Sequence, residues 1–341
     1  MPAAAAAEIL GRAAEAQVTD TRVTERIATV QDLLSDDLRW IESALAAAVD
    51  AGEAPATLAA RHLVTRGGKR VRPMALMLSA ACFGSVGPAV RELAVVSELV
   101  HSATLLHDDV VDEGMERRGV PTSRLSWGNA ISVLGGDLLL VHALSRTQQH
   151  APEIMPDLIA TLRRLVDGEI VQLRGRSELD VSEATYERIL RDKTASLFAW
   201  STRTGARLAG ASLEDQERLA GFGERLGIAF QLVDDVLDYS GSNTGKTLLT
   251  DLREGKLTLP LVLAVARMPE LVQPLKRIYA GDSESVNLVS RAVVESGVCD
   301  EVRRRASAHT RSAVEALRAV QPGPARVLLE GVAQQLAARA A

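Results

Sequence analysis

Residues 105–112 read Leu-Leu-His-Asp-Asp-Val-Val-Asp, and residues 231–238 read Gln-Leu-Val-Asp-Asp-Val-Leu-Asp. The two stretches carry aspartates at the same spacing among leucines and valines, which predicts two partly buried helices. In a helix, the first and last aspartate of each stretch are four residues apart and share a face. Like charges at this spacing destabilise an isolated helix, so we expect cations to compensate them.

The six aspartates of these stretches are candidate ligands of a metal ion: Asp108, Asp109, Asp112, Asp234, Asp235 and Asp238. Carboxylates without cysteine are typical ligands of Mg²⁺, which usually completes its coordination shell with substrate phosphates. A single acidic triplet is more often a solvated surface, but two matching triplets in apolar helices favour a site. Two facing aspartate helices would hold a metal-bound diphosphate. An EF-hand is excluded because its alternating oxygen ligands and central glycine are missing.

The composition favours a helical protein with an aliphatic core. Of the 341 residues, 47% are hydrophobic but only 3% are aromatic, and alanine and leucine favour helices. The net charge of −5, with both signs mixed along the chain, shows no nucleic-acid footprint. Two distant cysteines, Cys82 and Cys299, suit a reducing cytoplasm better than a disulfide framework.

The domain prediction is an N-terminal extension over residues 1–22 and one all-α domain over 23–341. No stretch approaches the roughly 18 uncharged apolar residues of a membrane span, so we expect no integral membrane segment. Apolar spacing with Gly and Pro breaks predicts about a dozen helices around a central cavity. The main expected helices cover 23–49, 55–65, 73–82, 88–113, 126–150 (broken at Gly135-Gly136), 156–173, 181–208 and 213–239, with loops at 114–121 and 240–255.

Two basic stretches lie near the first aspartate stretch. Residues 67–73 read Gly-Gly-Lys-Arg-Val-Arg-Pro at the start of an expected helix, and Arg117-Arg118 follows Asp112. Taken alone, each of these basic stretches would usually lie on a solvated surface. Beside a carboxylate–metal site, however, helix N-termini and paired arginines are suited to binding diphosphate oxygens.

Together these stretches resemble the trans-isoprenyl diphosphate synthases, also called polyprenyl synthetases, over about residues 66–261. The ordered motifs are the basic stretch 67–73, the first aspartate motif in 101–113, Arg-Arg-Gly at 117–119, Lys-Thr-Ala-Ser-Leu-Phe at 193–198, the second aspartate motif in 227–238, and Asp-Leu-Arg-Glu-Gly-Lys at 251–256. One DDxxD motif is weak evidence, but this ordered set is specific. The resemblance implies the all-α isoprenoid synthase fold and prenyl transfer.

The resemblance also implies roles for individual residues. The six aspartates would hold Mg²⁺ ions that bridge an allylic diphosphate, with Asp108, Asp109, Asp112, Lys193, Asp234 and Asp235 as the catalytic set. The allylic diphosphate would be bound by Arg117, Lys193, Thr194, Gln231, Lys246 and Lys256. The diphosphate of isopentenyl diphosphate would be bound by Lys69, Arg72, His101 and Arg118. Alone, His101 would more often be a core histidine, but its place seven residues before Asp108 matches the family position.

Ala103 and Thr104 lie about one helical turn before Asp108, where they would line the top of a tunnel for the growing product. Short-chain relatives place a bulky aromatic residue there, so Ala103 favours a long-chain product, hexaprenyl or longer. We expect this product to become a quinone side chain. A plug could lie deeper, at Phe83 or residues 138–140, and a geranylgeranyl product is the alternative. The resemblance further implies a homodimer.

Two other classes share this fold. A class I terpene cyclase would not need the second diphosphate site of Lys69, Arg72 and Arg118. A regulatory subunit of a heteromeric synthase would be expected to have lost aspartate or arginine positions, whereas all six aspartates are present. We therefore expect a transferase that uses isopentenyl diphosphate and an allylic diphosphate.

Overall fold

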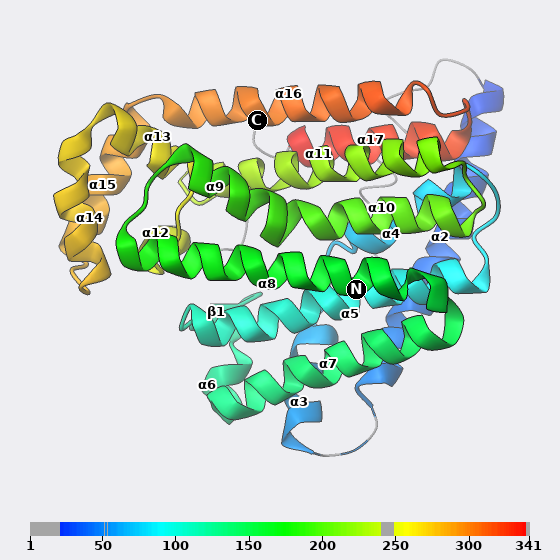
Figure 1. Ribbon diagram of the computed structural model, residues 1–341, viewed down its shortest axis with the longest axis horizontal. Helices are drawn as coiled ribbons and strands as arrows, with labels where there is room; N and C mark the ends of the chain where they lie inside the picture. The colour runs from blue at the N-terminus through cyan, green and yellow to red at the C-terminus, as the bar shows by residue number, and fades with distance from the viewer. Residues whose placement is uncertain (1–20, 51, 53, 240–248, 339–341) are drawn as a thin grey trace. The chain divides into compact units, whose positions relative to one another are not determined.

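The computed structural model describes residues 21–50, 52, 54–239 and 249–338, and these are almost entirely helical (Figure 1). Within that part of the chain, the only strands are β1 (Glu116–Arg117) and β2 (Val120–Pro121), which form a short antiparallel hairpin. The prediction of an all-α fold is therefore confirmed. The predicted loop over 114–121 is corrected to this hairpin, which is closed by Gly119 at φ +77°.

The chain divides into two compact units. Within the described residues, unit 1 takes in 21–159, 198–223 and 314–335, and unit 2 takes in 160–197, 224–313 and 336–338. Of the predicted extension over 1–22, residues 1–20 lie outside the described part, and Thr21 already begins a helix. The single domain over 23–341 and its central cavity stay predictions.

Unit 1 is built around α5 (Pro88–Val111), which packs along α7 (Asn129–His150) and against α4 (Val71–Ala81). The core side of α5 is aliphatic, with Leu93, Val96 and Val100 fully buried. The other elements that lie in or enter this unit are α2 (Thr21–Ala48), α3 (Pro55–Val64), α6 (Ser123–Trp127), η1 (Pro152–Ile154), the start of α8 (Met155–Glu178), most of α10 (Ser196–Leu208), the first part of α11 (Leu213–Leu237), the end of α16 (Val298–Leu317) and most of α17 (Pro324–Ala338).

The predicted break at Gly135-Gly136 is wrong, because α7 continues through both glycines. The helix boundary lies instead at Gly128, whose φ of +86° ends α6. A Cβ on Gly135 would lie 3.1 Å from the carbonyl oxygen of Ala56 in α3, and one on Gly136 would lie 2.3 Å from Nε2 of His107 in α5. The glycines therefore allow α7 to approach α3 and α5 closely, which sequence alone does not distinguish from a helix break.

Unit 2 contains the end of α11 and the helices that pack against it. These are α9 (Glu183–Ile189), α12 (Thr250–Arg253), α13 (Leu259–Arg267), η3 (Pro269–Leu271), α14 (Val272–Tyr279), α15 (Glu284–Glu295) and the first part of α16. Val236 of α11, Leu261 of α13, Leu275 of α14 and Val289 of α15 belong to one buried aliphatic cluster. This core holds the second aspartate stretch.

The predicted single helix over 181–208 is three consecutive segments. A π-helical turn, η2 (Leu190–Ala195), separates α9 from α10 and carries Lys193 and Thr194. A Cβ on Gly168 of α8 would lie 2.7 Å from the backbone nitrogen of Lys193, so the missing side chain lets α8 approach this turn. Such π-helical turns are frequent at functional sites.

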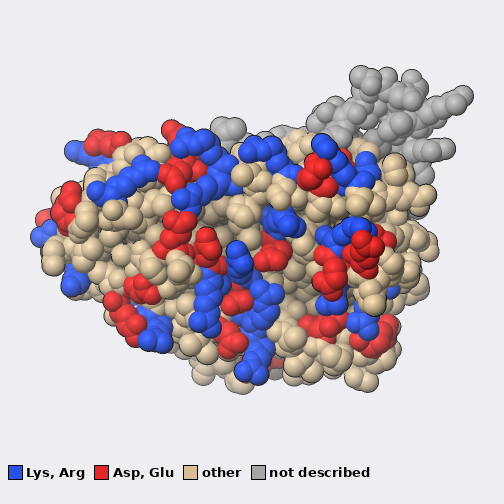
Figure 2. All heavy atoms as spheres, turned by 45° about the horizontal axis from the view of Figure 1, so that its top comes forward, with Lys and Arg blue, Asp and Glu red and all other residues tan. Residues whose placement is uncertain are grey.

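None of the described helices has the length and apolar character needed to cross a membrane. On the face drawn in Figure 2, acidic and basic side chains are interspersed, as the mixed charge of the sequence predicted. Both cysteines are free.

Candidate active site

The first aspartate stretch ends α5. The backbone N–H of Asp112, the C-cap residue, donates to the carbonyl oxygen of Asp108 at 2.8 Å. Asp108 is half-buried, whereas Asp109 and Asp112 are 2% and 6% exposed. Nε of Arg117 donates to Oδ1 of Asp109 at 2.6 Å. The hairpin therefore folds the first of the two adjacent arginines onto the middle aspartate.

Arg70, within the basic stretch, has a buried side chain. This residue precedes α4 with φ +48°, and its guanidinium donates to both carboxylate oxygens of Glu42 at 2.5 and 3.0 Å. It also pairs with buried Glu98 of α5 and donates to the carbonyl oxygen of Val64 at 3.2 Å. Burial by itself lowers the pKa of Arg70, but Glu98 and Glu42 outweigh it and raise the pKa. Arg70 thus fixes the loop that presents its neighbours.

Arg72 lies over the ring of Phe198, with 4.4 Å between its guanidinium carbon and the ring centroid. Burial lowers the pKa of Arg72 to about 10, against the opposing effect of Glu98. Nε of Arg72 is buried, and the described residues offer it no hydrogen-bond partner. A buried cation with an unused donor is suited to an anionic ligand.

His101 lies among four arginines. Burial, followed by Arg72, Arg118, Arg117 and Arg70, lowers its pKa well below the usual value, so its imidazole is neutral at physiological pH. The pKa of Arg118 is lowered by burial and by Arg70 and Arg117, with Glu98 opposing. The structure therefore brings Arg72, His101 and Arg118 together, while Lys69 is half-buried in the same loop.

The close approach of α10 to α4 helps to form this cluster. A Cβ on Gly205 of α10 would lie 2.0 Å from the carbonyl oxygen of Leu76 in α4, so only glycine permits the contact. The contact places Phe198, at the other end of α10, beneath Arg72 at the start of α4.

In unit 2, Asp235 of the second aspartate stretch accepts three hydrogen bonds. The donors are the hydroxyl of Tyr186 at 2.7 Å, Nε2 of Gln231 at 2.9 Å and the backbone N–H of Leu259 at 2.9 Å. Burial raises the pKa of Asp235 to about 7, although these three donors act in the opposite direction. Asp235 of α11 therefore accepts hydrogen bonds from α9, from α11 itself and from the first residue of α13.

The other two aspartates of this stretch differ in surroundings. Asp238 is 7% exposed, and its Oδ1 accepts the backbone N–H of Thr250, the first residue of α12, at 3.0 Å. Asp234 is half-buried, like Asp108 in unit 1. One half-buried aspartate in each stretch is therefore the most accessible carboxylate.

The predicted allylic diphosphate residues of unit 2 are partly assembled. The hydroxyl of Thr194 donates to Oε1 of Gln231 at 3.2 Å, and Lys193 pairs with Glu169 of α8. Lys256 pairs with Glu254 at 2.6 Å and lies 3.7 Å from Asp251. Lys246 lies outside the described residues.

The donor chemistry of the aspartate stretches fits Mg²⁺. Their side chains are hard oxygen donors, and within the described residues no three His, Cys, Asp or Glu side chains are grouped to hold a metal ion by themselves. Mg²⁺ usually binds through one or two carboxylates together with waters and substrate phosphates. The stretches therefore suit ions that arrive with a diphosphate.

The sequence prediction missed several residues that position this site: Arg70, Glu98, Glu169, Tyr186 and Phe198. Glu98 carried a signal, because it lies three residues before His101 and so shares its helix face. Tyr186 and Glu169 carried none, since their partners are distant in sequence.

Comparison with known proteins identifies the family. The polyprenyl synthetase family matches residues 55–296. The chain belongs to the polyprenyl synthetase family. It is 34% identical over 310 residues to octaprenyl diphosphate synthase of Escherichia coli K12, covering 89% of this chain and 96% of the relative.

Two solved structures are similar throughout. The polyprenyl synthase of Caulobacter crescentus CB15, complexed with calcium and isoprenyl diphosphate, has a TM-score of 0.85 and 33% identity over 93% of this chain and 98% of that one. A decaprenyl diphosphate synthase of Rhodobacter capsulatus has a TM-score of 0.83 and 34% identity over 92% and 99%. The predicted isoprenoid synthase fold and transferase class are confirmed, and the long-chain names of two of these proteins agree with the predicted type.

Proposed function

We propose that this chain condenses isopentenyl diphosphate with an allylic diphosphate, farnesyl or geranylgeranyl, to make a long-chain all-trans polyprenyl diphosphate. Family membership and the long-chain names of its relatives support the reaction class. The observation that carries the proposal is the arrangement of α5. His101 and Asp108 are seven residues apart on this helix, about 10 Å along its axis.

This arrangement provides for two phosphorylated substrates. The set around His101 contains Arg72 with its unused buried donor, and the set around Asp108 contains Asp112 and Arg117. A terpene cyclase ionises a single diphosphate and has no use for the first set. We therefore assign the diphosphate of isopentenyl diphosphate to Lys69, Arg72, His101 and Arg118.

The acidic stretches are proposed to bind the allylic diphosphate. Mg²⁺ bound there would supply positive charge that stabilises the departing pyrophosphate. All six aspartates are the proposed ligands, and three of them also accept hydrogen bonds: Asp109 from Arg117, Asp235 from three donors and Asp238 from the backbone N–H of Thr250. These hydrogen bonds would fix the orientation of the three carboxylates.

The protein's own residues would promote ionisation by charge and position. Arg117, Lys193, Thr194, Gln231, Lys246 and Lys256 are the proposed contacts of the allylic diphosphate. Preorganised cations stabilise charge that develops on a leaving group, and an apolar surrounding excludes water from the allylic cation. The double bond of isopentenyl diphosphate would then attack the cation and a proton would be lost. The released pyrophosphate is the proposed proton acceptor, because His101 is held among arginines that disfavour its protonation.

The deciding experiment incubates the purified chain with Mg²⁺, labelled isopentenyl diphosphate and farnesyl diphosphate, and sizes the dephosphorylated products. We expect a ladder that ends at hexaprenyl or longer. A stop at geranylgeranyl would keep the chemistry and contradict the chain length. Asp108→Ala and Asp234→Ala should each abolish turnover while the far-ultraviolet circular dichroism stays unchanged, and Asp36→Asn, at an exposed position of α2, serves as the control.

A homodimer is part of the proposal, and exposed apolar residues support it. Leu134 and Val141, one heptad apart on α7, are 53% and 56% exposed. On α8, Val166 and Ile170 are 59% and 56% exposed. Such apolar surfaces mark protein interfaces. Leu134→Glu should convert a dimer into a monomer in sedimentation. A cytoplasmic location and a quinone side chain as the use of the product stay predictions.

A further inference from the structure

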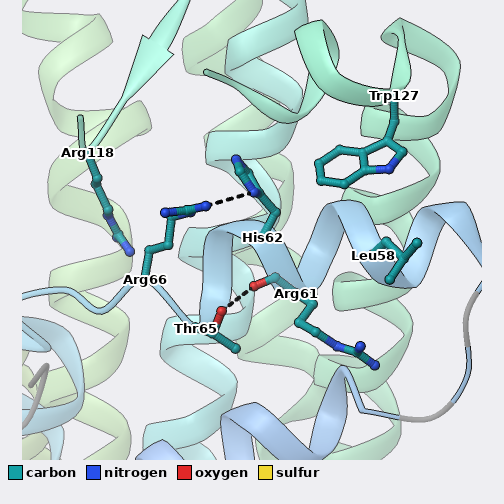
Figure 3. A pocket seen from close by; sticks show the side chains of 7 residues that line it. All are labelled: Leu58, Arg61, His62, Thr65, Arg66, Arg118 and Trp127. Carbon is teal, nitrogen blue, oxygen red and sulfur yellow. Dashed lines mark hydrogen bonds between the residues drawn. The ribbon is translucent and has the colours of Figure 1, made fainter. Parts of the chain in front are cut away.

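A groove of about 620 Å³ lies in unit 1, outside the residues assigned above apart from Arg118 (Figure 3). Five lining residues come from the region of α3, one from the β1–β2 turn and one from the end of α6: Leu58, Arg61, His62, Thr65, Arg66, Arg118 and Trp127. The volume falls within the range of small-molecule sites. Lys69, Arg72 and His101 do not line it.

The lining is cationic, with three arginines and no carboxylate. Arg61 is anchored away from His62, since its guanidinium donates to the carbonyl oxygens of Val49, Asp50 and Gly52 at 3.0 to 3.3 Å. Arg66 and Arg118 lie together on the other side of the groove (Figure 3). Within the described residues, neither is paired with a carboxylate. Arg66 donates to His62, and Arg118 donates to the carbonyl oxygen of Leu63 at 3.4 Å. Two guanidinium groups without an ion pair to a described carboxylate, at one end of a groove, are suited to bidentate binding of phosphate oxygens.

His62 separates this cationic end from an apolar end. Its Nε2 lies 2.8 Å from the carbonyl oxygen of Pro121 and must donate to it, so Nδ1 accepts from Arg66 at 3.3 Å. The ring also meets Trp127 edge-on, with centroids 5.1 Å apart and an angle of 73° between planes. The imidazole therefore contacts Pro121 and Arg66 through its two nitrogens and Trp127 through its ring. Trp127 and Leu58 form the apolar end (Figure 3).

We propose that this groove is a second binding site for a short prenyl diphosphate, and that its occupant inhibits turnover by engaging Arg118. The ligand chemistry follows from the two ends: the arginines would bind the diphosphate, and Trp127 with Leu58 would cover the prenyl group. Arg118 belongs to both sites, because its guanidinium also reaches the basic stretch, where a Cβ on Gly68 would lie 3.2 Å from Nη2.

The expectation that the occupant of the groove lowers the rate of turnover rests on the function proposed above. If Arg118 binds isopentenyl diphosphate for condensation, a second diphosphate that hydrogen-bonds to the same guanidinium lowers the affinity of the active site for isopentenyl diphosphate. High concentrations of isopentenyl diphosphate should then slow the enzyme, since the substrate itself is a short prenyl diphosphate.

The first test counts binding sites on the full chain, without metal or allylic substrate, by calorimetric titration with isopentenyl diphosphate. We expect two molecules per wild-type chain and one per chain for Arg66→Gln or Trp127→Leu. Arg163→Gln, which removes an exposed arginine in α8, should behave as the wild type. One molecule per wild-type chain would overturn the proposal. This count does not depend on turnover, so it separates failure of the groove from failure of the proposed function.

The second test follows the initial rate as isopentenyl diphosphate is raised at a fixed concentration of allylic diphosphate. The wild-type rate should pass through a maximum, whereas Arg66→Gln and Trp127→Leu should saturate with kcat/KM within about twofold of wild type. Inhibition that persists in both variants would contradict the proposal. Inorganic pyrophosphate should bind the groove at least tenfold more weakly than isopentenyl diphosphate; equal binding would show a bare anion site and overturn the assigned prenyl contact.

Discussion

The hydroxyl of Tyr186 donates a 2.7 Å hydrogen bond to Oδ2 of Asp235, and both residues are almost completely buried. Asp235 also binds Gln231, which in turn accepts a hydrogen bond from Thr194. A chain of hydrogen bonds therefore runs from α9 through α11 to the π-helical turn that carries Lys193. Buried networks of this kind hold their members in one arrangement when every group is satisfied.

Replacing Tyr186 by phenylalanine should destabilise unit 2 and disturb this turn. The change leaves a buried carboxylate with one donor fewer, which costs about 1–3 kcal/mol of unfolding free energy. Urea denaturation measures this loss, and we expect a higher KM for the allylic diphosphate. Tyr239→Phe is the matched control, because the buried hydroxyl of Tyr239 lies 3.2 Å from the hydroxyl of Thr258 and not beside a carboxylate oxygen among the hydrogen bonds of the described residues. An equal or greater loss in the control would contradict the special role of Asp235.

Glu98 is expected to be as important for folding as for binding. Its buried carboxylate pairs with Arg70 and faces Arg72 and Arg118. Removing one partner of a buried ion pair costs about 3–5 kcal/mol, and because Glu42 still holds Arg70 we expect Glu98→Gln to lie near about 3 kcal/mol. Urea denaturation tests this value. Asp36→Asn, which breaks the exposed pair with Arg39, should cost less than about 1 kcal/mol.

His101 should make the stability of the protein depend on pH. Its pKa is well below 6.5 in the folded chain, through burial and the surrounding arginines, whereas the unfolded chain takes up a proton near 6.5. The unfolded state therefore binds more protons as pH falls below 6.5, and stability declines by up to about 1.4 kcal/mol per pH unit. Above pH 6.5 the effect is absent.

Denaturation of wild type and His101→Gln between pH 8 and pH 5 measures this contribution. The variant should lose less stability than the wild type as the pH falls. His142→Gln is the comparison, because half-buried His142 also has a pKa lowered by burial and by Arg146. Parallel pH profiles for wild type and His101→Gln would show that His101 is not held neutral.

The sequence predicted those parts of the site that depend on spacing within one element. The two aspartate stretches, His101 seven residues before Asp108, and the basic stretch at the start of α4 are local patterns, and their helices form close to the predicted bounds. The prediction that all six aspartates bind the metal stays a prediction, and local spacing does not show that their surroundings differ. Their different surroundings come from tertiary contacts, such as Arg117 on Asp109 and Leu259 on Asp235.

Contacts between distant segments explain what sequence could not predict. Gly136 and Gly205 have the same propensity to break a helix, yet both lie inside helices where a neighbour leaves no room for a Cβ. Helix α8 can approach the π-helical turn at Leu190–Ala195 because Gly168 has no side chain. The local sequence pattern shows neither which distant segment packs against a glycine nor how close that segment comes.

Ala103 provides the test of chain length. It is fully buried in α5, five residues before Asp108, and the tunnel it is predicted to line stays a prediction. Ala103→Tyr should shorten the longest product, because a phenol ring about one turn below Asp108 would block a growing chain. Chromatography of the dephosphorylated products measures the shift, with the folded fraction checked by circular dichroism.

The matched control is Ala94→Tyr, at another fully buried alanine of α5. Nine residues separate Ala94 from Ala103, which places it two and a half turns away on the opposite face of the helix. Both variants overfill the core and should lose about 1–3 kcal/mol of stability. Only Ala103→Tyr should shorten the product, since only its side chain faces the predicted tunnel. If both variants keep the wild-type product length, the end of the tunnel is set by other residues, with Phe83 and Leu139 as the next to replace.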